Sequence, residues 1–114
     1  MIIITTQCFF PKIGGIESLM TGMAEAMADS GKKILVVADG IKSKDDELAN
    51  FSIKRFNHWK PFRRIYKANF IRRKCKVEKI EAIYADSWKS IEYLKNINVP
   101  KIVLAHGTEI QKKL

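Results

Sequence analysis

The chain begins with a short apolar run, and a second run of the same kind follows after one helix length of sequence. Residues 1–7 read MIIITTQ and residues 33–39 read KILVVAD, and both runs are continuous in apolar residues and rich in β-branched ones. Such runs are typical of strands that are covered on both faces of a sheet. Because a crossover between parallel strands is usually helical, the pair predicts a strand–helix–strand unit.

The segment between these runs has the spacing of an amphipathic helix, and Gly31 is a typical stop at its C-terminal end. Its apolar positions are Ile16, Leu19, Met20, Met23 and Met27. Further along, we expect strands at residues 51–56, 81–85 and 101–106, helices at residues 62–79 and 87–97, and a polar connection at residues 41–50.

This order of elements predicts an α/β fold with right-handed crossovers. We expect one Rossmann-like domain over residues 1–114, with a doubly wound, mostly parallel five-stranded sheet in the order 3-2-1-4-5. The content of 46% hydrophobic and 29% charged residues argues against disorder. No apolar run approaches the roughly 18 residues of a membrane span. Two cysteines form no disulfide framework, so the expected location is the cytoplasm.

The net charge of +9 is concentrated in one segment. Residues 54–76 hold ten Lys and Arg residues and no acid, whereas the rest of the chain holds eleven basic and twelve acidic residues. An excess of one sign in one segment indicates a charged surface and a partner of the opposite sign.

Three loops follow strand ends that this topology brings to one edge, where doubly wound sheets bind their ligands. They read CFFPKIGG, DS and HGTE. In the first loop, Gly14 and Gly15 allow close backbone approach to an anion at a helix start, and Glu17 in the first turn suits the helix dipole. Neither G-x-G-x-x-G nor the Walker pattern is present. A phosphate site and a simple tight turn therefore both remain open.

The stretch FFPKIGGIESLMTGMAEAMADSGKKILVVAD resembles the start of the retaining GT-B glycosyltransferases of family 4 (group 1), with their P-x-x-GG-[IVA]-[EQ] loop. VLAHGTE resembles the later strand of that family, which ends in H-G or H-D. The resemblance implies transfer of a sugar from a nucleotide diphosphate donor to a glycan or lipid-linked acceptor, as in polysaccharide biosynthesis. It implies no cofactor and no metal, because the nucleotide-sugar is a substrate.

The resemblance also implies roles for individual residues. Gly15, with Gly14 beside it, would face the distal phosphate of the donor, and His106 would be the catalytic residue beside the transferred sugar. Gly107 would let the backbone pass close by, and Lys12 and Glu17 would contact the acceptor or a phosphate. A histidine at the end of a buried strand is otherwise more often structural.

The sequence also departs from the family. A family member has a second domain, which binds the donor and carries a basic pair and an E-x7-E motif, and no such domain occurs in these 114 residues. We therefore expect a fragment, the acceptor-side half of a GT-B fold, that is inactive alone. A sheet cut short would also expose an edge that favours self-association. The sequence does not indicate which sugar, nucleotide or acceptor is used.

The basic segment has an aromatic stripe, because Phe62, Tyr66 and Phe70 recur at helical spacing after Trp59. The surrounding cations are Arg63, Arg64, Lys67, Arg72, Arg73 and Lys74. A helix of this kind can lie on an anionic bilayer, which would make the protein peripheral at the inner face of the membrane. Equally, the stripe could pack on the sheet and leave the cations solvated.

Other function classes have less support. Nucleic-acid binding also uses cations and aromatic residues, but the helical spacing and the lack of a recognised motif argue against it. A nicotinamide oxidoreductase would need the missing glycine fingerprint, and a hydrolase would need a G-x-S-x-G elbow. Asp86 and Ser87 are expected to cap the helix that follows them.

Overall fold

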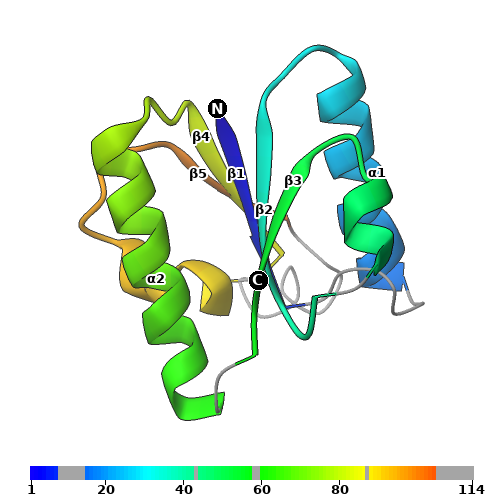
Figure 1. Ribbon diagram of the computed structural model, residues 1–114. Helices are drawn as coiled ribbons and strands as arrows, with labels where there is room; N and C mark the ends of the chain where they lie inside the picture. The colour runs from blue at the N-terminus through cyan, green and yellow to red at the C-terminus, as the bar shows by residue number, and fades with distance from the viewer. Residues whose placement is uncertain (8–14, 43, 58–59, 87, 105–114) are drawn as a thin grey trace, which may run out of the picture.

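The protein is an α/β domain whose five strands form one all-parallel sheet in the order β3-β2-β1-β4-β5 (Figure 1). The computed structural model describes residues 1–7, 15–42, 44–57, 60–86 and 88–104. The elements are β1 (Ile2–Thr6), α1 (Gly15–Asp29), β2 (Ile34–Asp39), the 3-10 helix η1 (Lys44–Leu48), β3 (Ser52–Phe56), α2 (Lys60–Val77), β4 (Ala82–Ala85), the 3-10 helix η2 (Trp88–Leu94) and β5 (Lys101–Val103). The Rossmann-like fold and the predicted strand order are confirmed.

β1 is the central strand and pairs with β2 on one side and β4 on the other. All five of its residues are buried, as expected for an apolar run covered on both faces. The chain steps from β1 outward to β2 and β3, and then returns to place β4 and β5 on the other side of β1. The topological switch point therefore lies between β1 and β4, where sheets of this kind bind ligands.

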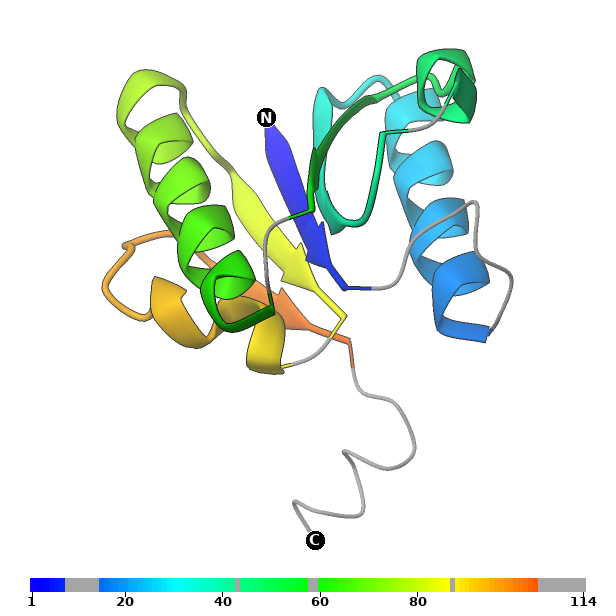
Figure 2. The same cartoon turned by 60° about the horizontal axis from the view of Figure 1, so that its bottom comes forward.

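α1 covers one face of the sheet, and α2 covers the opposite face (Figure 2). Met20 and Ala24 of α1 are fully buried against the even-numbered residues of β1 and β2. α1 ends as its sequence predicts: Gly31 has a φ of +93°, its N–H donates to Ala28, and the N–H of Lys32 donates to Met27. This Schellman arrangement requires a left-handed residue, which glycine provides without steric cost.

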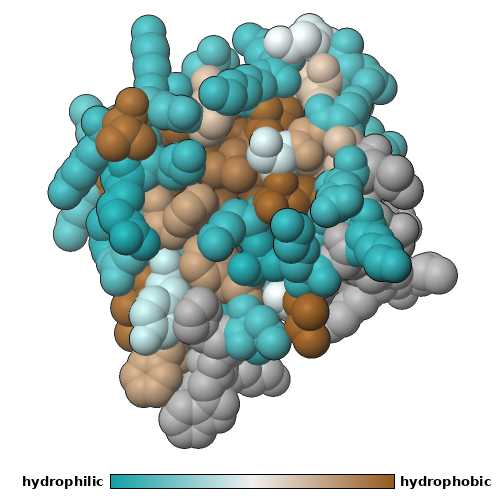
Figure 3. Space-filling model, in the orientation of Figure 1, coloured by the Kyte–Doolittle hydropathy of each residue, from teal (hydrophilic) through white to brown (hydrophobic). Residues whose placement is uncertain are grey.

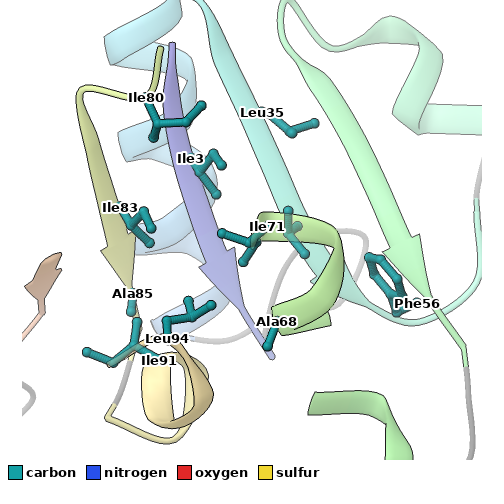
Figure 4. Close-up of a cluster of buried hydrophobic side chains, with 11 residues drawn as sticks. Ile3, Leu35, Phe56, Ala68, Ile71, Ile80, Ile83, Ala85, Ile91 and Leu94 are labelled. Atoms are coloured by element: carbon teal, nitrogen blue, oxygen red, sulfur yellow. The ribbon is translucent and has the colours of Figure 1, made fainter. Parts of the chain in front are cut away.

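The second core lies between the sheet and α2 with η2 (Figure 4). Ile71 of α2 is fully buried in it, and Phe70 meets Phe56 of β3 edge-to-face with ring centroids 5.6 Å apart. η2 contributes Ile91 and Leu94, whose spacing of three residues matches the turn of a 3-10 helix. Residues 88–94 thus form a 3-10 helix within the helix predicted for residues 87–97.

α2 and the connection before β3 also differ from the sequence expectation. α2 begins two residues earlier than predicted, since Pro61 lies in its first turn, where the missing N–H costs nothing. The connection at residues 41–50 contains η1. β5 is an edge strand, and Ile102 in it is 40% exposed. Self-association through this edge stays a prediction. Among the described residues, no helix is long and apolar enough to cross a membrane.

Candidate ligand site at the carboxyl edge of the sheet

The carboxyl ends of the strands meet at one edge because all neighbouring pairs are parallel. The arrowheads of β1, β2 and β4 point toward this edge in Figures 1 and 2. Polar side chains occur here at three strand ends: Thr6 is the last residue of β1, Asp39 is the last residue of β2, and Asp86 follows β4 directly. These residues lie at the edge of the sheet beside which a ligand would bind.

Asp86 joins the ends of β1 and β4 at the switch point. Its Oδ2 accepts hydrogen bonds from the Thr6 hydroxyl at 2.9 Å and from the Gln7 backbone N–H at 3.0 Å. Only 4% of Asp86 is exposed. A buried carboxylate is costly unless hydrogen bonds compensate it, so these two bonds explain why this position tolerates the charge.

Lys67 reaches the same point from α2. Its Nζ donates to the Thr6 carbonyl at 2.9 Å and to Asp39 Oδ1 at 2.8 Å. The Thr6 carbonyl and the Gln7 N–H belong to one peptide unit. An ammonium from α2 therefore holds the carbonyl of this unit, and a carboxylate from β4 holds its N–H. We call Lys67 and Asp86 the peptide clamp; it fixes the orientation of the chain where it leaves β1.

Burial lowers the pKa of Lys67 below its ordinary value of 10.5, because the ammonium loses its hydration. Asp39 opposes this decrease through its charge and its hydrogen bond, and Asp86 opposes it more weakly. Arg63 adds a small further decrease in the pKa. The cost of desolvation thus exceeds the attraction of the two carboxylates, although Lys67 has good hydrogen-bond geometry.

Asp39 is shared with a second cation, since Arg63 Nη1 lies 3.2 Å from its Oδ2. Next to it, Arg55 of β3 donates to both carboxylate oxygens of Asp46, at 2.9 and 3.0 Å, and also to the Asp39 carbonyl. Lys67, Arg63 and Arg55 thus each have a carboxylate partner. The arrangement holds the ends of β1, β2 and β3 and the N-terminal half of α2 in one fixed geometry.

α1 begins at Gly15 on the same edge and runs back toward the start of β2 (Figure 2). The first amide groups of a helix have no partner within it, and the helix dipole adds partial positive charge there. A helix start rich in backbone donors therefore follows the clamped end of β1 along the chain, at Gly15. Together these features form a base suited to an anionic ligand.

The structure describes only some of the residues predicted from the sequence. Lys12, Gly14, His106 and Gly107 lie outside the described residues. Gly15 is the first residue of α1, and Glu17 lies in the first turn of that helix. The roles that the resemblance implies for all six residues stay predictions.

The predicted basic surface divides into two groups. Lys67 was predicted to face outward, and this was wrong: it is 5% exposed and bonded to Asp39 and Thr6. Arg63 also turns toward Asp39. The other four cations lie at or near the surface: Arg64 pairs with Glu92, Arg72 donates to Asn69 and the Tyr93 carbonyl, Lys74 lies near the Phe70 ring, and Arg73 is exposed.

Sequence reasoning did not assign the clamp. The sequence pattern groups Lys67 with the surface cations, predicts a helix cap at Asp86, and places Asp39 at the end of a strand. A sequence signal did exist, because an acidic residue follows each of two buried runs, in ILVVAD and in AIYAD. Carboxylates at the ends of buried parallel strands need nearby donors, and a long cation on the crossover helix can provide one.

Comparison with known proteins adds no identification. No protein-family model matches this chain, and no curated protein matches it.

Proposed function

We propose that this chain forms the acceptor-side domain of a retaining glycosyltransferase of the GT-B type. Such an enzyme moves a sugar from a nucleotide diphosphate donor to a glycan or a lipid-linked acceptor. The proposal is supported by the glycine loop and the H-G-T-E segment in the sequence, and by the parallel order β3-β2-β1-β4-β5.

One observation carries the proposal. The glycine loop follows β1 and the H-G-T-E segment follows β5, and both strands deliver the chain to the same edge of the sheet, with only β4 between them. Had either strand been antiparallel, the two segments would have left the sheet at opposite ends and could not serve one site.

The charges of the edge fit an anionic substrate. Asp39 and Asp86 are each bonded to donors within the protein, so neither presents an uncompensated charge toward a ligand. The start of α1 supplies backbone donors and partial positive charge. Retaining transfer develops negative charge on the leaving diphosphate, and donors aimed at that charge would stabilise the transition state. We assign this role to the backbone at Gly15.

The proposal can be tested by NMR titration of the 15N-labelled protein with UDP, GDP, ADP and inorganic pyrophosphate. One half of a cleft should bind weakly, so we expect dissociation constants of about 1 mM, which correspond to about −4 kcal/mol. Chemical-shift changes should concentrate at the amides of Gln7, Gly15 and Ile16. The unphosphorylated nucleosides are the controls and should cause no change there.

Gly15→Val should weaken the response, since a β-branched side chain would block close approach to the backbone. As a matched control, Gly22→Ala changes a glycine in the middle of the same helix, where an added Cβ meets nothing within 4 Å. A response confined to the amino edge of the sheet, or none to any diphosphate at about 10 mM, would contradict the proposal.

A further inference from the structure

Over residues 62–77 of α2, the exposed residues all lie on one face, which we call the outer face. They are Phe62, Ile65, Tyr66, Asn69, Arg73, Lys76 and Val77. At about 100° per residue these positions fall within one third of the helix circumference. The buried residues Lys67, Ala68 and Ile71 lie on the opposite side, against the sheet. The outer face is therefore a continuous, partly exposed surface along the helix.

This face is unusually apolar for the solvent side of a helix. Phe62, Ile65 and Tyr66 are 48%, 42% and 46% exposed, and they are clustered within the first two turns of the helix. Val77, at the other end, is 75% exposed. Single exposed apolar side chains are common, but a cluster of large ones on one element marks an interaction surface.

The same face is positively charged. α2 contains eight Lys and Arg residues and no acid. Arg73 and Lys76 lie on the outer face and have no acidic partner among the described residues, and Arg72 and Lys74 flank them. Figure 3 shows teal side chains on the side where α2 lies, interrupted by brown apolar ones. Arg64, at the margin, is neutralised by Glu92.

We propose that the outer face of α2 docks on an anionic lipid bilayer, with the helix lying in the plane of the membrane. Phe62 and Ile65 would enter the acyl boundary, the Tyr66 ring would sit at headgroup level, and Arg73 and Lys76 would contact lipid phosphates. Ile65 and Val77 favour a bilayer over a nucleic acid, because aliphatic side chains give no base stacking. This inference does not depend on the proposed glycosyl transfer.

Vesicle co-sedimentation of the full chain tests the proposal. With vesicles of phosphatidylcholine and about 30% phosphatidylglycerol we expect binding, and with pure phosphatidylcholine we expect none. Each cation near an anionic surface accounts for about a fivefold change in partitioning. Arg73→Glu with Lys76→Glu should therefore reduce partitioning at least 25-fold. Raising the salt concentration should reduce the binding of the unaltered protein.

Matched variants distinguish an effect of the outer face from a general effect of net charge or of exposed apolar side chains. Lys42→Glu with Lys44→Glu changes the net charge equally but at exposed residues around the start of η1, and it should change partitioning less than fivefold. Phe62→Ser with Ile65→Ser should reduce partitioning at least tenfold. Leu19→Ser with Ile41→Ser, which alters residues 49% and 71% exposed in α1 and in the segment after β2, should have little effect. Circular dichroism confirms that each variant is folded.

Three outcomes would overturn the proposal. The first is no binding to the anionic vesicles. The second is equal loss of binding in the control variants, which would mean a general effect of charge. The third is that single-stranded RNA releases the protein from vesicles, while Phe62→Ser with Ile65→Ser leaves the affinity for RNA unchanged. That result would identify the outer face as an electrostatic nucleic-acid surface.

Discussion

Each face of α2 carries side chains that an amphipathic helix usually places on the other face. Its inner face carries two cations, Lys67 and Arg63, and both reach Asp39 at the end of β2. Its outer face exposes Phe62, Ile65 and Tyr66. On the inner face, the buried ammonium of Lys67 is compensated because the Asp39 carboxylate and the Thr6 carbonyl accept its hydrogen bonds. On the outer face, these three large apolar side chains remain between 42% and 48% exposed.

The comparison shows that the type of side chain alone does not determine which side of a helix is buried. Ala68 and Ile71 occupy the inner face beside the cations and contact the core, so the helix docks through a few apolar residues together with an ionic contact at one end. Burying an ion pair gives little net stability. We therefore attribute the docking energy to the apolar contacts and the angle and register of docking to the ionic ones.

The largest expected effect tests the apolar part of this division. Ile71 is fully buried, so Ile71→Ala removes apolar contacts and leaves a cavity. We expect the free energy of unfolding to fall by about 4 kcal/mol. The same truncation on the outer face, Ile65→Ala, should cost less than about 0.5 kcal/mol. Urea denaturation followed by circular dichroism measures both; similar losses would show that the outer face is buried in solution.

The next effect compares two ion pairs of the same helix. Asp39→Asn keeps the size of the side chain but removes the charge shared by Lys67 and Arg63, leaving a buried ammonium without a carboxylate at 2.8 Å. We expect a loss of about 3 kcal/mol in the free energy of unfolding. Glu92→Gln makes the same change beside Arg64, where the side chains are 40% and 48% exposed, and should cost less than about 1 kcal/mol.

Equal losses in these two variants would mean that the burial of Asp39 and Lys67 has no energetic consequence, and the proposed division between the faces would fail. The Asp39→Asn protein could be unfolded, and Arg63→Met is then the control, because it removes the more exposed of the two cations that pair with Asp39. The prediction holds in that case only if the Arg63→Met protein remains folded.

The fold was predictable because its signals are local. The runs at residues 1–7 and 33–39 are strands because β-branched residues suit a sheet covered on both faces, and Gly31 ends α1 because its left-handed backbone favours glycine. The parallel order followed from helices that separate the strands and from the right-handed rule for crossovers. None of these inferences required knowledge of which side chains meet.

The peptide clamp was not predictable in the same way. Asp39, Lys67 and Asp86 are separated along the chain by 19 residues or more, and only the order of β2, β1 and β4 with α2 across them brings these side chains together. Lysine is rarely buried, so a pattern-based reading places Lys67 outside. Similarly, the spacing of Phe62, Tyr66 and Phe70 predicts one stripe, but α2 is rotated so that Phe70 contacts Phe56 and the other two are exposed.

The smallest expected effect concerns Lys67. Lys67→Met keeps an unbranched side chain of similar length, and Asp39 keeps Arg63 at 3.2 Å, so no buried carboxylate is left alone. We expect a cost of about 1 kcal/mol near neutral pH, from the lost hydrogen bond to the Thr6 carbonyl. Because that bond is half of the peptide clamp, the 15N shift of the Gln7 amide should also change in a protein that remains folded.

The lowered pKa of Lys67 predicts how the stability difference between the unaltered protein and Lys67→Met changes with pH. Burial lowers the pKa in the folded state, so the folded protein loses this proton at a lower pH than the unfolded chain, whose lysine has its ordinary pKa of 10.5. Between those two values the unfolded state holds more protons, and stability rises with pH. The free energy of unfolding of the unaltered protein should therefore increase relative to that of Lys67→Met as the pH approaches 10.5. A difference that decreases would mean that attraction by Asp39 and Asp86 outweighs desolvation and that the inner face of α2 is stabilised by its charge, and a constant difference would mean that the two effects balance.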